Sequence, residues 1–501
     1  MSAELIGAKM LAPYFGSSLY VWSAVMAVTL GGLASGYFLG GLISARNNKP
    51  RTLYVVVLIA ALFIMLMPVS SEMILSLSGK HALLPSVILC TTFFLLPPVL
   101  MMGMVAPLII HALEPEQGQA GKAAGAVYAV STIGGIFSTL ITGFWLIPEF
   151  GLRLPCICLG MVLSLIPLCW LVIKAKNRFY FLIGLILMLT IVICKAGKSQ
   201  KTEKIKILYQ SEGLMGQLIV ADYPEEFKKG SPVKSNDRVL FANRIWQTRK
   251  STLPDSLHLF GYMEQILHHI PRAGQNRKVL VCGLGGGILA QELHAEGFQV
   301  EACELDSRMV FISHAFYGLD PSIPVHIDDA RHFIRTTTSK YDFVILDLFK
   351  GEETPGHCFT KEAFSEIKSL LNPDGLLIIN APGFITGEAG AGMRAVFRTL
   401  LDSDFDICLM PAGEGESGRN LLFYACKKGS SSVRKVLEEA KESGEEIISE
   451  NSVLGSTDKC MVDDKPVLDQ LNLIANKIWR RNAINFFQDE LNQGRMLPLF
   501  R

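Results

Sequence analysis

Long apolar runs with few charged positions fill the chain up to about residue 195, and nearly all Asp, Glu, Lys and Arg residues lie beyond that point. A helix needs about 20 apolar residues to cross the roughly 30 Å hydrocarbon layer of a bilayer. Runs of that order lie near 17–44, 53–70, 83–112, 123–147 and 154–173, and a shorter run covers 179–194. The pattern predicts a multi-span α-helical membrane bundle of about six to seven helices over residues 1–195.

Small residues and prolines stand out inside the predicted spans. Gly32, Gly36 and Gly40 recur every four residues, which puts them on one helix face where a neighbouring backbone can approach closely. We expect this face to serve helix packing, with solute transport as the weaker alternative. Pro97 and Pro98 interrupt the third run, which predicts a kink there, with a substrate cavity as the alternative.

After residue 205 the apolar positions form short strands separated by turns. A small N-terminal β-hairpin region comes first, over 205–209, 216–222 and 239–242. Strand and helix patterns then alternate, with a helix at 288–296 and strands at 278–282, 299–304, 325–327, 341–346 and 376–380, the last after a turn at 372–375. Such alternation is typical of an α/β doubly wound, Rossmann-like fold with a mostly parallel sheet, which we expect over residues 196–501.

Composition agrees with a membrane part joined to a soluble part and excludes some functions. Of the 501 residues, 50% are hydrophobic and 19% are charged, which is more apolar than a soluble enzyme needs. The net charge is +1 and no dense Lys/Arg tract occurs, so nucleic acid is not an expected partner. The 11 cysteines are scattered without CxxC pairs or zinc spacing, which indicates reduced thiols and no metal site.

A glycine-rich turn follows the first parallel strand, and acids follow the next two strands. The turn contains Gly283, Gly285 and Gly287, whose lack of a Cβ lets a ligand approach the backbone at a helix N-terminus. Glu304 ends the second strand and is placed to accept both hydroxyls of a ribose. After the third strand, Asp329 and Ala330 are placed to receive an adenine amino group. This order predicts an adenosyl-binding domain of the S-adenosylmethionine type.

These residues resemble the spermidine synthase family, specifically its membrane-fused branch, which has an N-terminal multi-span transmembrane domain. In the membrane half, the segments similar to that branch are 11–18, 40–46 and 125–135. In the soluble half, the similar segments are 243–247, 262–268, 347–350 and 354–357. Residues 463–466 are similar to the family's C-terminal acidic segment, and we expect a charged surface turn there.

The resemblance implies a polyamine aminopropyltransferase. Members of the family transfer an aminopropyl group from decarboxylated S-adenosylmethionine to a diamine such as putrescine. Asp347 is then the catalytic residue, as general base and electrostatic partner of the sulfonium, with a capping or ribose-binding carboxylate as the alternative. Gln247 would contact the nucleotide co-substrate, while Tyr262 and Glu264 would contact the amine.

Three positions depart from the family pattern. The acid that holds the aminopropyl ammonium falls on Gly286, the second acid of the catalytic motif falls on Lys350, and Met263 replaces the helix histidine. Adenosyl binding depends less on these positions than polyamine synthesis does. Two alternatives therefore stay open: an S-adenosylmethionine-dependent methyltransferase, and a non-catalytic membrane transporter or sensor that binds an adenosyl ligand.

Basic residues predict the side of the membrane on which the soluble part lies. Lysines and arginines follow the first and fifth predicted spans, and counting spans places both groups on one side, which the positive-inside rule makes cytoplasmic. We expect a multi-pass protein of the inner cell membrane with a cytoplasmic soluble domain, which requires 179–194 to be interfacial or re-entrant. The expected partners are lipid and a small amine, with a homodimer as a further option.

Overall fold

The computed structural model divides the chain into two compact units. One consists of Met1–Lys204, Tyr209–Ile219 and Ile484–Arg501, and the other of Ile205–Leu208 and Val220–Ala483. The structure describes residues 1–15, 19–46, 50–78, 83–113, 120–175, 205–213, 215–223, 236–252, 261–270, 277–348, 354–412, 419–453 and 459–492.

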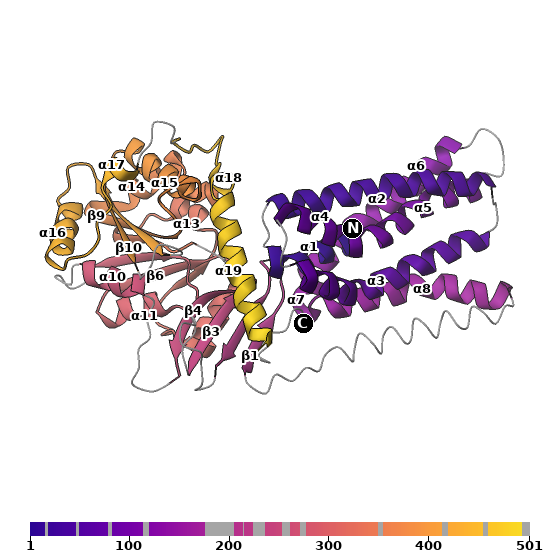
Figure 1. Cartoon of the computed structure of the whole chain (residues 1–501), viewed down its shortest axis with the longest axis horizontal. Helices are drawn as coiled ribbons and strands as arrows, with labels where there is room; N and C mark the ends of the chain where they lie inside the picture. The colour runs from indigo at the N-terminus through magenta and orange to yellow at the C-terminus, as the bar shows by residue number, and fades with distance from the viewer. Residues whose placement is uncertain are drawn as a thin grey trace. The chain divides into compact units, whose positions relative to one another are not determined.

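The first unit consists mainly of long apolar helices. They are α1 (Ser2–Phe15), α2 (Leu19–Arg46), α3 (Pro50–Ser78), α4 (Leu83–Phe94), α5 (Leu96–Leu113), α6 (Ala120–Ile141), α7 (Ile147–Phe150) and α8 (Arg153–Ala175). Five stretches of the described residues are long and apolar enough to cross a membrane: Val21–Arg46, Pro50–Leu75, Leu96–Leu113, Gly121–Phe150 and Arg153–Ile173. In Figure 1, α2 lies along α5 and α3 lies along α8. The predicted run at 179–194 lies outside the described residues.

The predicted glycine face packs one helix against another. A Cβ on Gly40 would lie 2.7 Å from the carbonyl oxygen of Met104, and a Cβ on Gly103 would lie 2.9 Å from that of Leu33. Only glycine permits this approach of α2 to α5, so the packing prediction is confirmed. The third apolar run is interrupted at Leu95, two residues before Pro97, and divides into α4 and α5.

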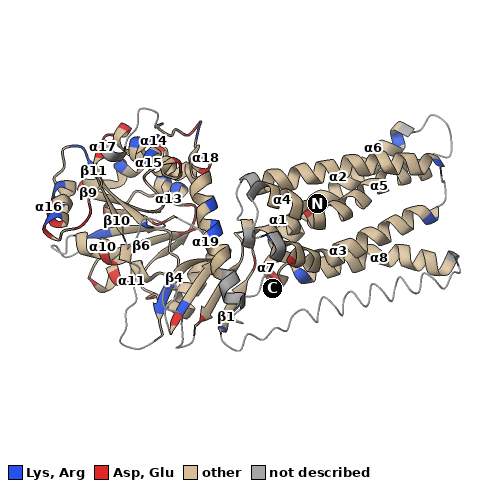
Figure 2. Ribbon diagram, in the orientation of Figure 1, with Lys and Arg blue, Asp and Glu red and all other residues tan. Residues whose placement is uncertain are grey.

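Some charged side chains of the helical unit have partners within it. Glu72 lies in α3, which extends beyond the predicted run to Ser78, and forms an ion pair with Arg153 at the start of α8. Lys9 of α1 is buried, with its ammonium 5.9 Å from the centre of the Trp22 ring. Figure 2 shows few charged residues along α2, α3, α5 and α8, and many on the second unit. Pairing lowers the cost of placing such charges in apolar surroundings.

The second unit is built on a seven-stranded sheet in the order β10-β11-β9-β8-β5-β6-β7. Its strands are β5 (Lys278–Cys282), β6 (Gln299–Glu304), β7 (Val325–Ile327), β8 (Tyr341–Leu346), β9 (Leu371–Pro382), β10 (Phe405–Ala412) and β11 (Asn420–Lys427). Strands β5 to β9 pair in parallel, whereas β10 and β11 are antiparallel. This is the predicted doubly wound, mostly parallel sheet, and its order reverses between β5 and β8, where ligands of such folds bind.

The described chain after residue 205 also contains helices and a second, smaller sheet. The helices are α10 (Gly261–His269), α11 (Ile288–Ala295), α12 (Ser307–Ile312), α13 (Ala330–Thr336), α14 (Lys361–Leu370), α15 (Ala391–Asp402), α16 (Ser432–Glu442), α17 (Glu450–Val453), α18 (Leu468–Leu471) and α19 (Leu473–Asn492). The four-stranded sheet has the order of the chain: β1 (Lys206–Ser211), β2 (Leu218–Asp222), β3 (Asp237–Ala242) and β4 (Ile245–Ser251). Asn243 and Arg244, both with positive φ, form the tight turn between β3 and β4.

Strand β9 differs from its prediction. It begins at Leu371 and includes the predicted turn at 372–375. Leu371 pairs with Tyr341 of β8, and the register then shifts before Phe343 pairs with Leu376. The shift takes up the extra residues, so the chain enters the sheet earlier than its turn-forming sequence indicates.

Candidate active site

The glycine turn brings the ends of β5 and β8 together. Gly283, Gly285 and Gly287 have φ values of +92°, +53° and +77°, in the left-handed region that favours glycine. A Cβ on Gly283 would collide with the carbonyl oxygen of Asp347, and the Asp347 N–H donates to the Cys282 carbonyl at 2.8 Å. The turn therefore places its backbone beside the residue that follows β8.

Glu304 connects the end of β6 to this turn. Its Oε2 accepts from the Leu284 N–H at 3.0 Å, and its Oε1 accepts from the Asp306 N–H at 2.8 Å. The carboxylate is thus oriented by two backbone N–H groups at the carboxyl end of β6.

Asp329 begins α13 as its N-cap. Its Oδ1 accepts from the N–H groups of Arg331 and His332 at 3.0 and 3.1 Å, and its Oδ2 lies 3.0 Å from His357 Nε2. Burial raises the pKa of Asp329, but the hydrogen bonds from the His332 backbone and the His357 ring hold it below its usual value. Ala330 is the first residue of the helix and is buried.

Asp347 accepts one hydrogen bond on each carboxylate oxygen. The Tyr262 hydroxyl of α10 donates to Oδ2 at 2.9 Å, and the Asn380 side-chain amide of β9 donates to Oδ1 at 2.8 Å. Asp347 keeps some exposed surface although protein surrounds most of it, and burial raises its pKa while the two hydrogen bonds lower it. Burial and the nearby Asp347 raise the pKa of Tyr262 well above its usual value, so Tyr262 acts as a donor.

Sequence reasoning missed Asn380 and its neighbour Asn420. Asn380 is buried, and its Oδ1 accepts from the Asn420 Nδ2 of β11 at 2.9 Å. Asn420 therefore fixes the amide of Asn380 with its nitrogen toward Asp347. The available signal was a polar residue at the carboxyl end of an apolar parallel strand, the sheet edge that also carries Asp347.

Thr248 fills the space beside Gly286. The Gly286 N–H donates to Thr248 Oγ1 at 2.8 Å, and a Cβ at position 286 would lie 2.5 Å from Thr248 Cγ2. Thr248 is buried on β4, next to Gln247. An acidic side chain at position 286 would require Thr248 to move, which explains physically why this chain carries glycine there.

The other candidate residues lie in different surroundings. Gln247 is partly buried, with its Nε2 3.4 Å from the Trp246 carbonyl oxygen. Glu264 is exposed on α10, about 200° around the helix axis from the buried Tyr262. Their roles stay predictions, and Lys350 lies outside the described residues. Among the described residues no group of three or more His, Cys, Asp or Glu has the arrangement of a metal site.

Comparison with known proteins gives one matching family. The sequence profile of the spermine/spermidine synthase domain matches residues 259–387. The chain is 28% identical over 203 residues to a polyamine aminopropyltransferase of Vibrio vulnificus, covering 39% of this chain and 64% of that protein. It is 22% identical over 392 residues to polyamine aminopropyltransferase 2 of Aquifex aeolicus, covering 74% of each.

Solved structures also show a likeness. A probable spermidine synthase from Corynebacterium glutamicum superposes with a TM-score of 0.39 at 17% identity, covering 52% of this chain and 95% of that protein. The chain spans less than two thirds of the length of the Vibrio relative. The matched segment at 259–387 begins just before α10 and contains the glycine turn, Glu304, Asp329, Asp347 and Asn380.

Proposed function

We infer from the spermine/spermidine synthase domain at residues 259–387 that this chain is a membrane-anchored transferase of the polyamine aminopropyltransferase type. It would transfer an aminopropyl group from decarboxylated S-adenosylmethionine to an amine such as putrescine, releasing methylthioadenosine. The observation that carries the proposal is Asp347, an acid at the carboxyl end of β8 held through both oxygens by Tyr262 and Asn380.

The proposed reaction is a displacement at carbon. The amine nitrogen attacks the methylene carbon beside the sulfonium, so that a C–N bond forms while the C–S bond breaks. The bonding electron pair stays on sulfur, which becomes a neutral thioether, and the proton lost by the amine passes to Asp347. A carboxylate beside the reacting centre also attracts the cationic donor and the incoming ammonium.

The ionisation of Asp347 suits this role. Its raised pKa makes it a stronger base than an exposed aspartate. The two donors hold its oxygens in a fixed plane, which reduces the motion needed to meet the amine proton. These features support Asp347 as the proton acceptor.

Glu304 and Asp329 support binding of the adenosyl part. They follow neighbouring parallel strands, as expected for acids that contact a ribose and an adenine. Asp329 keeps one acceptor position on Oδ2 after its bonds to the protein.

One observation favours a second candidate function. Thr248 occupies the space where an acid at position 286 would contact the donor's ammonium. Without that acid, discrimination against the carboxylate of intact S-adenosylmethionine is weaker. The second candidate is therefore an S-adenosylmethionine-dependent methyltransferase that uses the same nucleotide site.

Membrane anchoring is supported by the apolar helices. Within the described part of the chain, five stretches reach spanning length, and their largely unburied apolar surface suits contact with lipid. A cytoplasmic catalytic domain would have access to the donor and to amines made in that compartment.

Product analysis distinguishes the candidates. The full-length chain, purified in detergent, is incubated with putrescine and either decarboxylated or intact S-adenosylmethionine. Methylthioadenosine with the decarboxylated donor supports aminopropyl transfer, whereas S-adenosylhomocysteine with the intact donor supports methyl transfer. Asp347→Asn should lower turnover by about 10²–10⁴-fold with little change in methylthioadenosine binding. Binding of methylthioadenosine without either product, over a panel of amines, contradicts both enzyme functions.

A further inference from the structure

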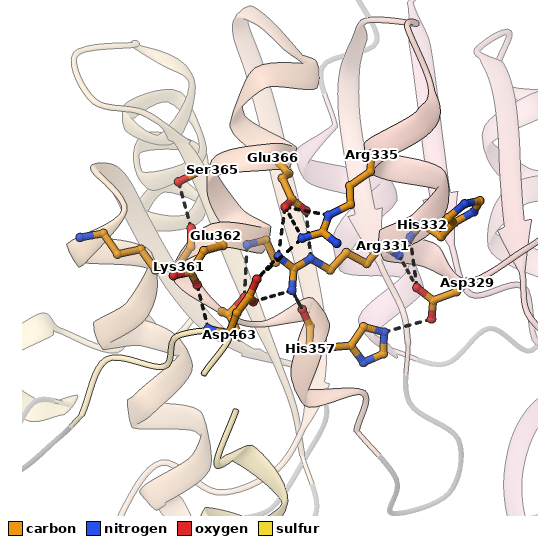
Figure 3. Close-up of polar contacts among 12 residues, drawn as sticks. Asp329, Arg331, His332, Arg335, His357, Lys361, Glu362, Ser365, Glu366 and Asp463 are labelled. Carbon is orange, nitrogen blue, oxygen red and sulfur yellow. Dashed lines mark hydrogen bonds and ion pairs between the residues drawn. The ribbon is translucent and has the colours of Figure 1, made fainter. Parts of the chain in front are cut away.

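Arg331 of α13 is the centre of a saturated polar network (Figure 3). Its side chain is 7% exposed. Nε and Nη2 donate to the Glu366 carboxylate of α14 at 2.9 and 3.0 Å, and Nη1 and Nη2 donate to Asp463 at 2.5 and 2.7 Å. Nη1 also donates to the His357 carbonyl at 2.8 Å. All five N–H donors of the guanidinium are used, so the backbone of His357 is held by a nearly buried cation.

His357 in turn contacts Asp329. With its backbone held by Arg331, the imidazole lies across the Asp329 carboxylate, as Figure 3 shows. The carboxylate is therefore held at two points: Oδ1 by two backbone N–H groups of α13 and Oδ2 by the ring. The terminal torsion of an aspartate is soft, so two anchoring points are needed to fix the plane of its oxygens.

The count of acceptor positions shows what this carboxylate can still bind. An ionised carboxylate offers about four positions, and the bonds from α13 and His357 use three of them. The remaining position is on Oδ2, and the Asp329 side chain is 36% exposed, so a ligand can reach it. Asp329 can only accept there, because the bonds that lower its pKa favour the ionised form.

We propose that His357 is a positioning residue that makes the nucleotide site select a 6-amino purine, by fixing Asp329 with one acceptor position toward the purine. This inference rests on the proposed adenosyl site. The amino group of adenine donates to the open position on Asp329. The 6-oxo oxygen of hypoxanthine is itself an acceptor, so it cannot form this hydrogen bond and is repelled by the carboxylate. Loss of the imidazole frees the carboxylate plane, so the selection weakens.

The neighbouring His332 provides a matched control. Its Nδ1 lies 2.6 Å from Asp328 Oδ2, so it also forms a histidine–aspartate pair at this end of α13. It is 65% exposed, and only its backbone, which a substitution retains, contacts Asp329. An exposed pair of this kind contributes little by itself. A general effect of removing a histidine here would therefore appear in both variants.

Calorimetric titration of the full-length chain tests the proposal. The ligands are methylthioadenosine and methylthioinosine, and the proteins are the wild type, His357→Leu, His357→Gln and His332→Leu. We expect the wild type to prefer methylthioadenosine and His357→Leu to bind it about tenfold more weakly, with methylthioinosine changed by less than about twofold. Glutamine keeps an N–H donor, so His357→Gln should restore most of the preference. His332→Leu should match the wild type.

Several outcomes would contradict this inference and leave the proposed function unaffected. Tighter methylthioadenosine binding by His357→Leu would mean that the imidazole competes with adenine instead of positioning Asp329. An equal loss for both ligands, or for His332→Leu, would assign His357 a merely structural role. Failure of the wild type to bind methylthioadenosine would instead contradict the adenosyl site itself, and with it the proposed function.

Discussion

The side-chain amide of Asn380 donates to Asp347 Oδ1 across two parallel strands, and Asn420 holds that amide in place from the next strand. A neutral donor so placed stabilises the ionised carboxylate and lowers its pKa, against the rise caused by burial. The pKa of Asp347 therefore reflects two opposing effects: burial raises it, and the hydrogen bond from Asn380 lowers it.

Asn380→Leu should remove one of the effects that lower the pKa of Asp347. Loss of the donor raises the pKa of Asp347 further, so a higher pH is needed to ionise the base and the acid limb of the kcat/KM profile moves to higher pH. Turnover should therefore fall most at acidic pH, where the base of the variant is no longer ionised. Rates of product formation between pH 5 and pH 9 (about the range of most enzyme assays) measure the position of the acid limb.

Asn420→Ala is the graded control for that experiment. It removes the bond that orients Asn380 but leaves the Asn380 donor, so the acid limb should move in the same direction by less. An acid limb that stays in place in Asn380→Leu would show that Asp347 does not act as the base.

The path of the strands was predictable, whereas the partners of the site residues were not. The strands β5, β6, β7 and β8 occupy the residues predicted for them. For β5 and β8 the reason is burial on both faces of the parallel sheet, which leaves a local apolar pattern. The bond from Asn380 to Asp347 depends on the register between β8 and β9, which shifts after Tyr341. A local pattern of apolar residues does not predict such a shift in strand register.

The same distinction holds around the nucleotide site. The glycine turn and its acids follow from their order along the chain, since parallel strands bring successive strand ends to one edge. Thr248 lies on the four-stranded sheet, whereas Gly286 lies in the turn after β5 of the seven-stranded sheet. Asp463 lies more than a hundred residues after Arg331. A local pattern indicated only a surface turn at 463–466, although Asp463 pairs with a nearly buried arginine.

The pair Thr248 and Gly286 gives a prediction about donor choice. Gly286→Asp alone should weaken binding of both donors, because its Cβ meets Thr248. Thr248→Gly with Gly286→Asp makes room for the acid, and a carboxylate facing the donor ammonium should then favour the decarboxylated donor by about tenfold relative to the wild type. Competition titrations with the two donors measure the ratio.

Thr248→Gly alone is the control for the space that the double variant opens beside position 286. It should leave the donor ratio near the wild-type value, because no charge is added. If the double variant and this control give the same ratio, the side chain at position 286 does not face the donor ammonium.

Sidedness can be tested by labelling. Ser430→Cys, in a background without the native cysteines, should react with a membrane-impermeant maleimide only from the cytoplasmic side of sealed vesicles. Glu149→Cys, at the exposed end of the fourth apolar stretch, should react from the opposite side by the same count of spans. Labelling of both from one side would mean that the run at 179–194 crosses the membrane and that the domain is not cytoplasmic.

Asp463 should make part of the stability of the α/β unit depend on pH. Hydrogen bonds from Arg331 and Thr360 hold the pKa of Asp463 at about 2 in the folded chain, whereas an unfolded aspartate has a pKa of about 3.9. A lowered folded pKa means that the contribution is fully present above about pH 4 and is lost as the pH falls toward 2. Asp463→Asn should therefore lower the Tm at pH 7, and the difference from the wild type should shrink below about pH 4. Thermal unfolding of the full chain at several pH values measures this, with the exposed neighbour Asp464→Asn as the control expected to follow the wild type. A difference that stays constant down to the acid range would show that the carboxylate charge of Asp463 does not stabilise the fold through Arg331.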